Sequence, residues 1–135
     1  AAVLPVLSNG NVVLVRQFRY PIGQVTLEVP AGKLDVEGED PLHCARRELS
    51  EETGYTAEQY EKLTTIATTV GFSNEYIHLY LARNLSVGKQ HTDEDEFVNV
   101  VQMPFSDALA MVKSGEIIDS KTIISLMMAQ ERLSG

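Results

Sequence analysis

Short apolar, β-branched runs alternate along the chain with polar stretches rich in turn-forming residues, which predicts several short strands and few helices. The first two runs are joined by "SNGN", in which Asn9-Gly10 is a strong hairpin signal. The expected strands are 2–7, 12–18, 25–29, 61–69, 75–82 and 97–103. Because these strands do not alternate regularly with helices, we expect an α/β layered domain with a mixed sheet rather than a doubly wound parallel one.

Three segments carry helical spacing or helix start and stop signals, namely 41–53, 106–113 and 119–133. In the first, Leu42, Ala45 and Leu49 recur at three- and four-residue spacing and predict a buried stripe. Asp40 can cap this helix and a proline occupies its first position, whereas Gly54 suits the residue after its end. The sequence therefore predicts one internal helix between strands and two helices near the C-terminus.

The composition indicates one globular domain over residues 1–135, since this length supports a single core and 44% of the residues are hydrophobic. No apolar run is long enough to span a membrane. The single cysteine, Cys44, excludes an internal disulfide and fits a reducing cytoplasm, where we expect the protein. A net charge of −8 without clustered Lys and Arg argues against a nucleic-acid partner. A phosphorylated small molecule bound through a divalent cation is still allowed.

The segment "RRELSEETGY" concentrates charge just before the glycine that should end the first helix. Glu48 and Glu52 are four residues apart and project from the same side of the helix, and Glu51 borders that side. Like charges at this spacing are mildly destabilising. One interpretation is a solvated acidic face neutralised by the two preceding arginines. The other interpretation is a binding site for a hard divalent ion such as Mg²⁺, which carboxylate oxygens bind readily.

The wider context of this segment resembles a known motif. Glu39 is followed by seven residues and then by "RELSEETGY", which matches E-x7-R-E-U-x-E-E-x-G-U, where U is a bulky apolar residue. This pattern resembles the Nudix box of the Nudix hydrolases, which implies an α/β/α sandwich with a mixed sheet, the metal-binding helix between strands and two C-terminal helices. The chain departs from the motif in one place: Gly32 lies seven positions before Glu39 rather than six, with Lys33 in the expected place.

Further segments resemble the ADP-ribose pyrophosphatase branch of that family, namely "VRQFRYP", "LEVPAGKLD", "GFSNE" and "DEDEF". The resemblance implies a metal site that takes Mg²⁺, with Mn²⁺ as a substitute. Its expected ligands are Glu48, Glu52 and the backbone carbonyl of Ala31. Glu51 is expected either to bind the metal directly or to contact one of its ligands. The residues with expected orienting or structural roles are Gly32, Glu39, Arg47 and Gly54.

In this branch the catalytic base comes from a loop far along the chain, and "HTDEDEF" is the acidic loop in the right place. Glu94 and Glu96 are therefore the expected candidates for the base, with Glu51 as a further catalytic candidate, and a solvated acidic loop is the alternative. The expected substrate contacts are Arg19, Gly71, Phe72 and Ser73. Lys121 is interpreted as a charge on the surface of the last helix.

The resemblance implies Mg²⁺-dependent hydrolysis of the diphosphate of ADP-ribose to AMP and ribose 5-phosphate by metal-activated water. The box itself is shared by enzymes that act on other nucleoside diphosphate derivatives, such as nucleotide sugars or dinucleotides, so these are the alternative. A non-catalytic ADP-ribose sensor is a further alternative. The resemblance also implies a homodimer. Because the chain opens directly on a strand without Met, we expect further residues upstream, and the resemblance implies that they form additional N-terminal strands.

Overall fold

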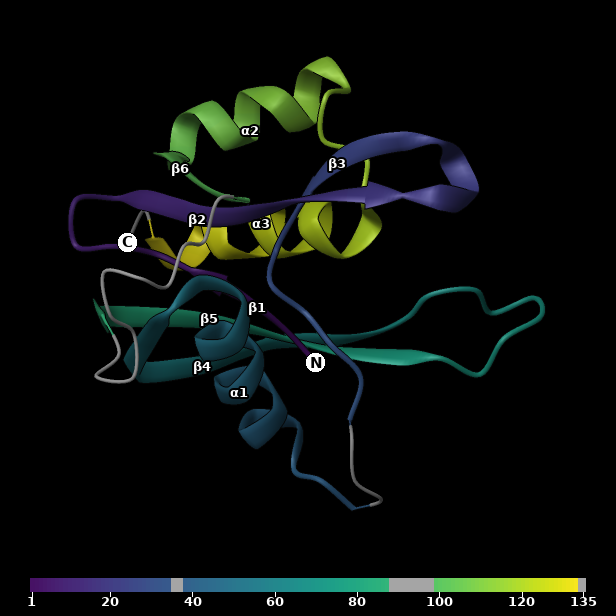
Figure 1. Ribbon diagram of the computed structural model, residues 1–135, viewed down its shortest axis with the longest axis horizontal. Helices are drawn as coiled ribbons and strands as arrows, with labels where there is room; N and C mark the ends of the chain where they lie inside the picture. The colour runs from purple at the N-terminus through teal and green to yellow at the C-terminus, as the bar shows by residue number, and fades with distance from the viewer. Residues whose placement is uncertain (35–37, 88–98, 134–135) are drawn as a thin grey trace.

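The computed structural model describes residues 1–34, 38–87 and 99–133 (Figure 1). In chain order, the elements are β1 (Ala2–Pro5), β2 (Asn11–Arg19), a 3₁₀ turn (Tyr20–Ile22), β3 (Gln24–Glu28), α1 (Pro41–Thr53), β4 (Tyr55–Ala67), β5 (Tyr76–Val87), β6 (Val100–Pro104), α2 (Phe105–Ser114) and α3 (Ser120–Leu133). No helix among these residues is long and apolar enough to cross a membrane.

The strands form two three-stranded sheets. In the first, with order β1-β5-β4, β1 is parallel to β5 and β4 is antiparallel to it, which confirms the expected mixed sheet. The second, with order β3-β2-β6, is antiparallel throughout. Helix α3 contacts strands of both sheets, α1 contacts the first sheet, and α2 packs against β2, β6 and α3 (Figure 1). The α/β fold with one internal helix and two C-terminal helices is confirmed.

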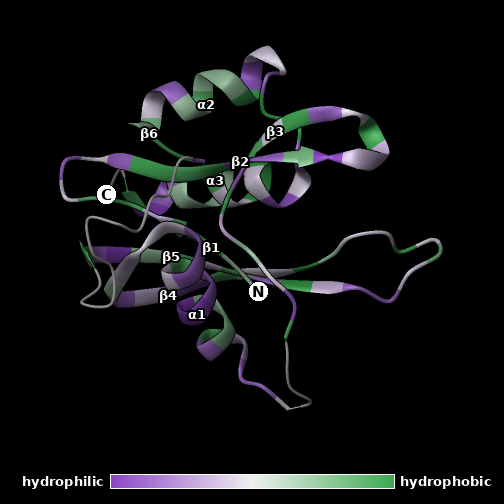
Figure 2. Ribbon diagram, viewed as in Figure 1, coloured by the Kyte–Doolittle hydropathy of each residue, from purple (hydrophilic) through white to green (hydrophobic). Residues whose placement is uncertain are grey.

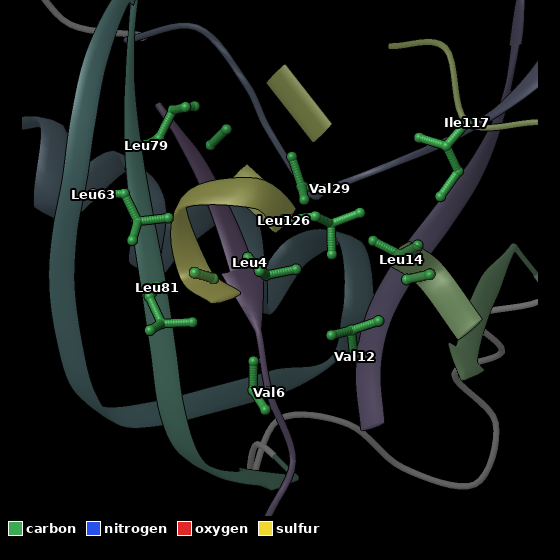
Figure 3. Packing of buried hydrophobic residues seen from close by; sticks show 13 residues of the cluster. Leu4, Val6, Val12, Leu14, Val29, Leu63, Leu79, Leu81, Ile117 and Leu126 are labelled. Carbon is green, nitrogen blue, oxygen red and sulfur yellow. The ribbon is translucent and has the colours of Figure 1, made fainter. Parts of the chain in front are cut away.

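Strand β1 is buried on both faces and separates two apolar clusters. Side chains alternate along a strand, so Leu4 faces the larger cluster and Val3 faces the smaller one. The larger cluster joins both sheets to α3 through Leu4, Val12, Leu14, Val29, Leu79, Leu81 and Leu126 (Figure 3). The smaller cluster joins β1 and β5 to α1 through Val3, Cys44, Ala45, Leu49, Tyr80 and Ala82. Ala45 and Leu49 of the predicted α1 stripe are therefore buried, and Leu42 packs at the edge of the cluster, partly buried.

Strand β2 changes character along its length. Its first half is hydrophobic and buried, and its second half is hydrophilic and largely exposed (Figure 2). The hydrophilic half pairs with β3, from Val15 opposite Glu28 to Arg19 opposite Gln24. The β2–β3 hairpin therefore extends away from the core while its base is anchored in it. It exposes polar side chains and also large apolar ones, among them Phe18, Tyr20 and Val25.

The largest difference from the predicted elements is at the start of β4. The strand begins at Tyr55 rather than at 61, and its partner β5 continues to Val87 rather than 82. The two strands pair along almost their whole length, from Tyr55 opposite Val87 to Ala67 opposite Tyr76. The added part of β4 is mostly exposed, so it has no dense apolar run that would mark it as a strand.

Candidate functional site

Helix α1 carries the acidic residues of the motif and has defined ends. The Asp40 side chain accepts a hydrogen bond from the amide of Leu42, at 3.1 Å, so it caps the helix as predicted. Gly54 has a φ of 79°, in the left-handed region that glycine adopts without strain, and its amide donates to the carbonyl of Ser50. These ends fix the helix over Pro41–Thr53, as expected from the sequence.

Arg47 connects three carboxylates of the motif. Its guanidinium donates to both carboxylate oxygens of Glu39, at 3.2 and 3.3 Å, and to Oε1 of Glu48, at 2.8 Å. It also lies 3.5 Å from Glu51. The Glu39 side chain is only 6% exposed, so this ion pair is largely shielded from water. Arg47 therefore links the start of the motif to the glutamates of α1 through direct ion pairs.

The loop after β3 approaches the same helix closely. A Cβ atom added to Gly32 would lie 2.2 Å from both Cδ and Oε1 of Glu48, which is closer than any real Cβ contact. The amide of Ala31 donates to Oε2 of Glu52, at 3.2 Å. Glycine at 32 therefore leaves the space that the Glu48 carboxylate occupies, and the loop and helix together bring Ala31, Glu48 and Glu52 to one place.

The environments of the three glutamates differ. Glu48 is buried and Glu52 is half-buried, whereas the Glu51 side chain is 60% exposed. Burial, with a smaller contribution from the charge of Glu48, raises the pKa of Glu52 from 4.5 to about 7, although the Ala31 amide and Lys121 oppose the shift. A solvated acidic face therefore describes Glu51 but not the other two. A buried carboxylate with a raised pKa is a group that a bound cation would stabilise.

The residues present fit a divalent ion. Among the described residues, no group of three His, Cys, Asp and Glu side chains is arranged to hold a metal. Mg²⁺, however, is usually bound by one or two carboxylates together with substrate phosphates and water, rather than by a complete protein cage. Two carboxylates, Glu48 and Glu52, beside the peptide group of Ala31 match that donor set.

Glu52 opens onto a cavity of about 740 Å³. Its lining includes Arg19, Ala31, Gly32, Glu52, Asp119 and Lys121. The Arg19 guanidinium binds the Glu28 carboxylate in a bidentate manner, with Nε to Oε2 at 2.6 Å and Nη2 to Oε1 at 2.5 Å. The cavity is therefore lined by a carboxylate, that of Glu52, which suits a cation, and by a guanidinium, that of Arg19, which suits an anion.

Lys121 is not on the surface, so its interpretation as a surface charge of the last helix is wrong, and its partner is Glu28, which no motif indicated. Lys121 is only 8% exposed, and its ammonium lies 2.7 Å from Oε1 of Glu28. Burial opposes ionisation of Glu28, but hydrogen bonds from Arg19, Lys121 and Thr26 outweigh it and lower its pKa from 4.5 to about 2. The available signal was the placement of Thr26 and Glu28 two residues apart, on one face of a strand that runs into the core.

The remaining predicted residues lie elsewhere. Gly71, Phe72 and Ser73 occupy the exposed turn between β4 and β5, outside the lining of the cavity, and Phe72 is 88% exposed. Thr68 and Glu75, at the base of that turn, do line it. Glu94 and Glu96 lie outside the described residues.

A model of the NUDIX domain matches residues 1–125. The chain belongs to the Nudix family. Proteins of this family generally use a divalent metal, and their substrates are nucleoside diphosphate derivatives, in agreement with the donor set described above.

Relatives of similar sequence have names that describe different activities. An ADP-ribose pyrophosphatase of Bacillus subtilis is 46% identical over 131 residues, which cover 96% of this chain and 70% of the relative. A methanol dehydrogenase activator of Bacillus methanolicus is 44% identical, with the same coverage. A GDP-mannose pyrophosphatase of Yersinia enterocolitica is 40% identical, over 90% of this chain and 68% of the relative. Two of these names describe pyrophosphatases, and the substrates that they give differ.

A solved structure described as an ADP compounds hydrolase has the same fold, with a TM-score of 0.83. It is 22% identical and covers 99% of this chain and 72% of the other. At this identity the match establishes the arrangement of helices and strands, and the chemistry is argued from the side chains.

Proposed function

We propose that this Nudix hydrolase cleaves the diphosphate of ADP-ribose, in the presence of Mg²⁺, to AMP and ribose 5-phosphate. The proposal rests on the cavity that both Arg19 and Glu52 line. A diphosphate bound through a cation needs an anion-binding group for its oxygens and carboxylates for the cation, and this cavity offers both. The B. subtilis relative supports the choice of ADP-ribose.

Glu48, Glu52 and the Ala31 carbonyl would hold Mg²⁺, which when bound neutralises phosphate charge and lowers the pKa of bound water. Arg47 keeps the Glu48 carboxylate in place through the 2.8 Å ion pair. Arg19 binds the oxygens of the diphosphate and keeps it in the cavity. Each of these residues acts by orientation and charge, and none forms a covalent bond with the substrate.

In the reaction, a water oxygen forms a new bond to one phosphorus while the bond from that phosphorus to the bridging oxygen breaks. The bridging oxygen leaves on the other phosphate, and the proton of the attacking water passes to a carboxylate. Glu94 and Glu96 remain the proposed bases, with Glu51 as the further candidate. The exposed Glu51 side chain already pairs with Arg47, so we favour the loop glutamates.

The Yersinia relative favours a second candidate, hydrolysis of a nucleotide sugar such as GDP-mannose. The same carboxylates and the same arginine would serve that reaction, because the diphosphate is common to both substrates. The two functions therefore differ in the groups attached to the phosphates and not in the chemistry at phosphorus.

The test is to incubate the protein with ADP-ribose and, separately, with GDP-mannose and dinucleotides, each with Mg²⁺ or Mn²⁺, and to follow nucleoside monophosphate release by chromatography. We expect the highest kcat/KM with ADP-ribose and no release when the metal is chelated. A higher kcat/KM with GDP-mannose would replace the proposed substrate by the second candidate. Binding of ADP-ribose without turnover at any divalent ion would instead identify a sensor.

A further inference from the structure

Four charged residues from three elements form a network next to the cavity. Arg19 ends β2, Glu28 ends β3, and Asp119 and Lys121 lie at the start of α3. Glu28 binds Arg19 on one side and Lys121 on the other, and Lys121 also binds both oxygens of Asp119, at 3.1 and 3.2 Å. We call these four residues the Glu28 network. Its formal charges sum to zero, which lowers the cost of burying Glu28 and Lys121.

The Glu28 carboxylate is fully used by this arrangement. Oε1 accepts from Arg19 and Lys121, and Oε2 accepts from Arg19 and from the hydroxyl of Thr26, at 2.5 Å. A carboxylate has about four lone-pair sites, so each of them has a donor. With only 1% of Glu28 exposed, the carboxylate has a single defined orientation, and its orientation sets the plane of the Arg19 guanidinium.

Lys121 is committed to two carboxylates. Its ammonium donates one N–H to Oε1 of Glu28 and lies between both oxygens of Asp119, which are close enough together for a single N–H to serve both. Its side chain is only 10% exposed. Although Lys121 lines the cavity, its charge is already used within the network.

Arg19 differs in this respect. A guanidinium carries five N–H bonds, and two of them are donated to Glu28. In the part of the chain that the structure describes, the other three make no hydrogen bond, and the side chain is 46% exposed at the cavity. Arg19 therefore directs the remaining N–H groups of its guanidinium towards a ligand bound in the cavity.

The start of α3 is fixed in turn. Asp119 accepts hydrogen bonds from the amide and hydroxyl of Thr122, at 3.2 and 2.6 Å, and the Thr122 hydroxyl accepts from the amide of Val29, at 2.9 Å. Lys121 thus sits on a helix end that is bonded to the strand carrying Glu28. This rigidity is what a residue needs in order to hold another one in place.

We propose that Lys121 is a positioning residue: through Glu28 it aims the free side of the Arg19 guanidinium at the substrate diphosphate. The inference rests on the proposed function, which puts the diphosphate in this cavity. It assigns the C-terminal helix a part in substrate binding although Lys121 itself does not touch the substrate.

The test is a double-mutant cycle of Lys121→Met and Arg19→Ala, with Lys113→Met as the control. Lys113 is an exposed lysine of α2, so its variant makes the same charge change away from the cavity. We expect Lys121→Met to raise the KM for ADP-ribose about tenfold with a smaller change in kcat. Lys113→Met should stay within about twofold of the wild type.

The cycle separates positioning from a direct effect of charge. If Lys121 acts through Arg19, then Lys121→Met adds less than about twofold to the KM in the Arg19→Ala background, because the group it positions is gone. An undiminished, about tenfold effect in that background would overturn the proposal, since it would mean that Lys121 acts on the substrate or on the whole fold. Unfolding midpoints measured for each variant identify a fold-wide effect.

Glu28→Gln provides an independent variant in case Lys121→Met does not fold. It keeps the size of the side chain and removes the shared charge, so it should raise the KM and should likewise lose its effect once Arg19 is absent. An equal effect with and without Arg19 would contradict the proposal. Failure of the proposed function looks different, because the wild-type protein would then release no AMP from ADP-ribose.

Discussion

The close approach of Gly32 to Glu48 makes Gly32→Ala a sharp probe of the metal site. The new Cβ would lie 2.2 Å from the Glu48 carboxylate, whereas ordinary contacts begin at 3.4 Å, so the carboxylate must retreat by 1.2 Å. The Gly32 backbone itself is not in the left-handed region, so alanine introduces no backbone strain there. The effect of the substitution should therefore fall on Glu48 and not on the loop.

A displacement of about 1 Å in a group that positions the reaction can lower activity about 100-fold. We therefore expect kcat/KM to fall by about 10- to 100-fold and the Mg²⁺ concentration for half-maximal activity to rise. The unfolding midpoint should change little, because a glutamate side chain can rotate away and because alanine reduces the entropy of the unfolded chain.

The assay is a titration of activity against Mg²⁺ at saturating substrate, followed by thermal unfolding of each variant. The matched control is the same substitution in a Glu48→Ala background, where the new methyl group has no carboxylate to displace. There Gly32→Ala should have little further effect. Wild-type kcat/KM and metal dependence in the single Gly32→Ala variant would refute the assignment of Glu48 to the metal.

Three further outcomes are expected. Glu52→Gln should lower kcat by orders of magnitude with the unfolding midpoint preserved, whereas the exposed Glu58→Gln should be neutral; a mild effect at Glu52 would exclude it as a metal ligand. Because the pKa of Glu28 is lowered, its contribution is present above pH 4.5, and about 3 kcal/mol should be lost from the free energy of unfolding as the pH falls towards about 2. Urea unfolding of Glu28→Gln should lack this component, and an identical acid dependence would contradict it. Gly54→Ala should cost about 1 kcal/mol in thermal unfolding, because alanine is strained at a φ of 79°.

The parts of the fold that were predicted correctly are those with local signals. The first helix was placed at the observed residues because Asp40 and Gly54 mark its ends and an apolar stripe marks its buried side. The start of β4 at Tyr55 was missed because that stretch is exposed and is held as a strand by pairing with β5, a contact distant in sequence. Local patterns predict elements well when burial and capping define them, and poorly when pairing alone does.

In the candidate site, too, the contacts between residues close in sequence were predictable and those between distant residues were not. Glu39, Arg47, Glu48 and Glu52 lie within one short segment whose spacing follows the helix, so their proximity was predictable. The pairing of Glu28 with Lys121 was not, because 93 residues separate them and no periodicity relates a strand end to a helix start so far away. The second sheet was likewise not anticipated, because alternation in a strand does not indicate which sheet it joins.

The separation of Glu28 from Lys121 has a consequence during synthesis of the protein. A nascent chain that has just completed the segment from Glu39 to Gly54 already contains the whole motif and both proposed metal-binding carboxylates. Glu28, however, still has only the Arg19 guanidinium as a charged partner, because Lys121 lies 93 residues further along the chain and is synthesised later. Loss of one partner of a buried charge is costly, so the β2–β3 hairpin should dock most stably once α3 has emerged. The order of translation would thus delay completion of the Arg19 side of the cavity until α3 is made.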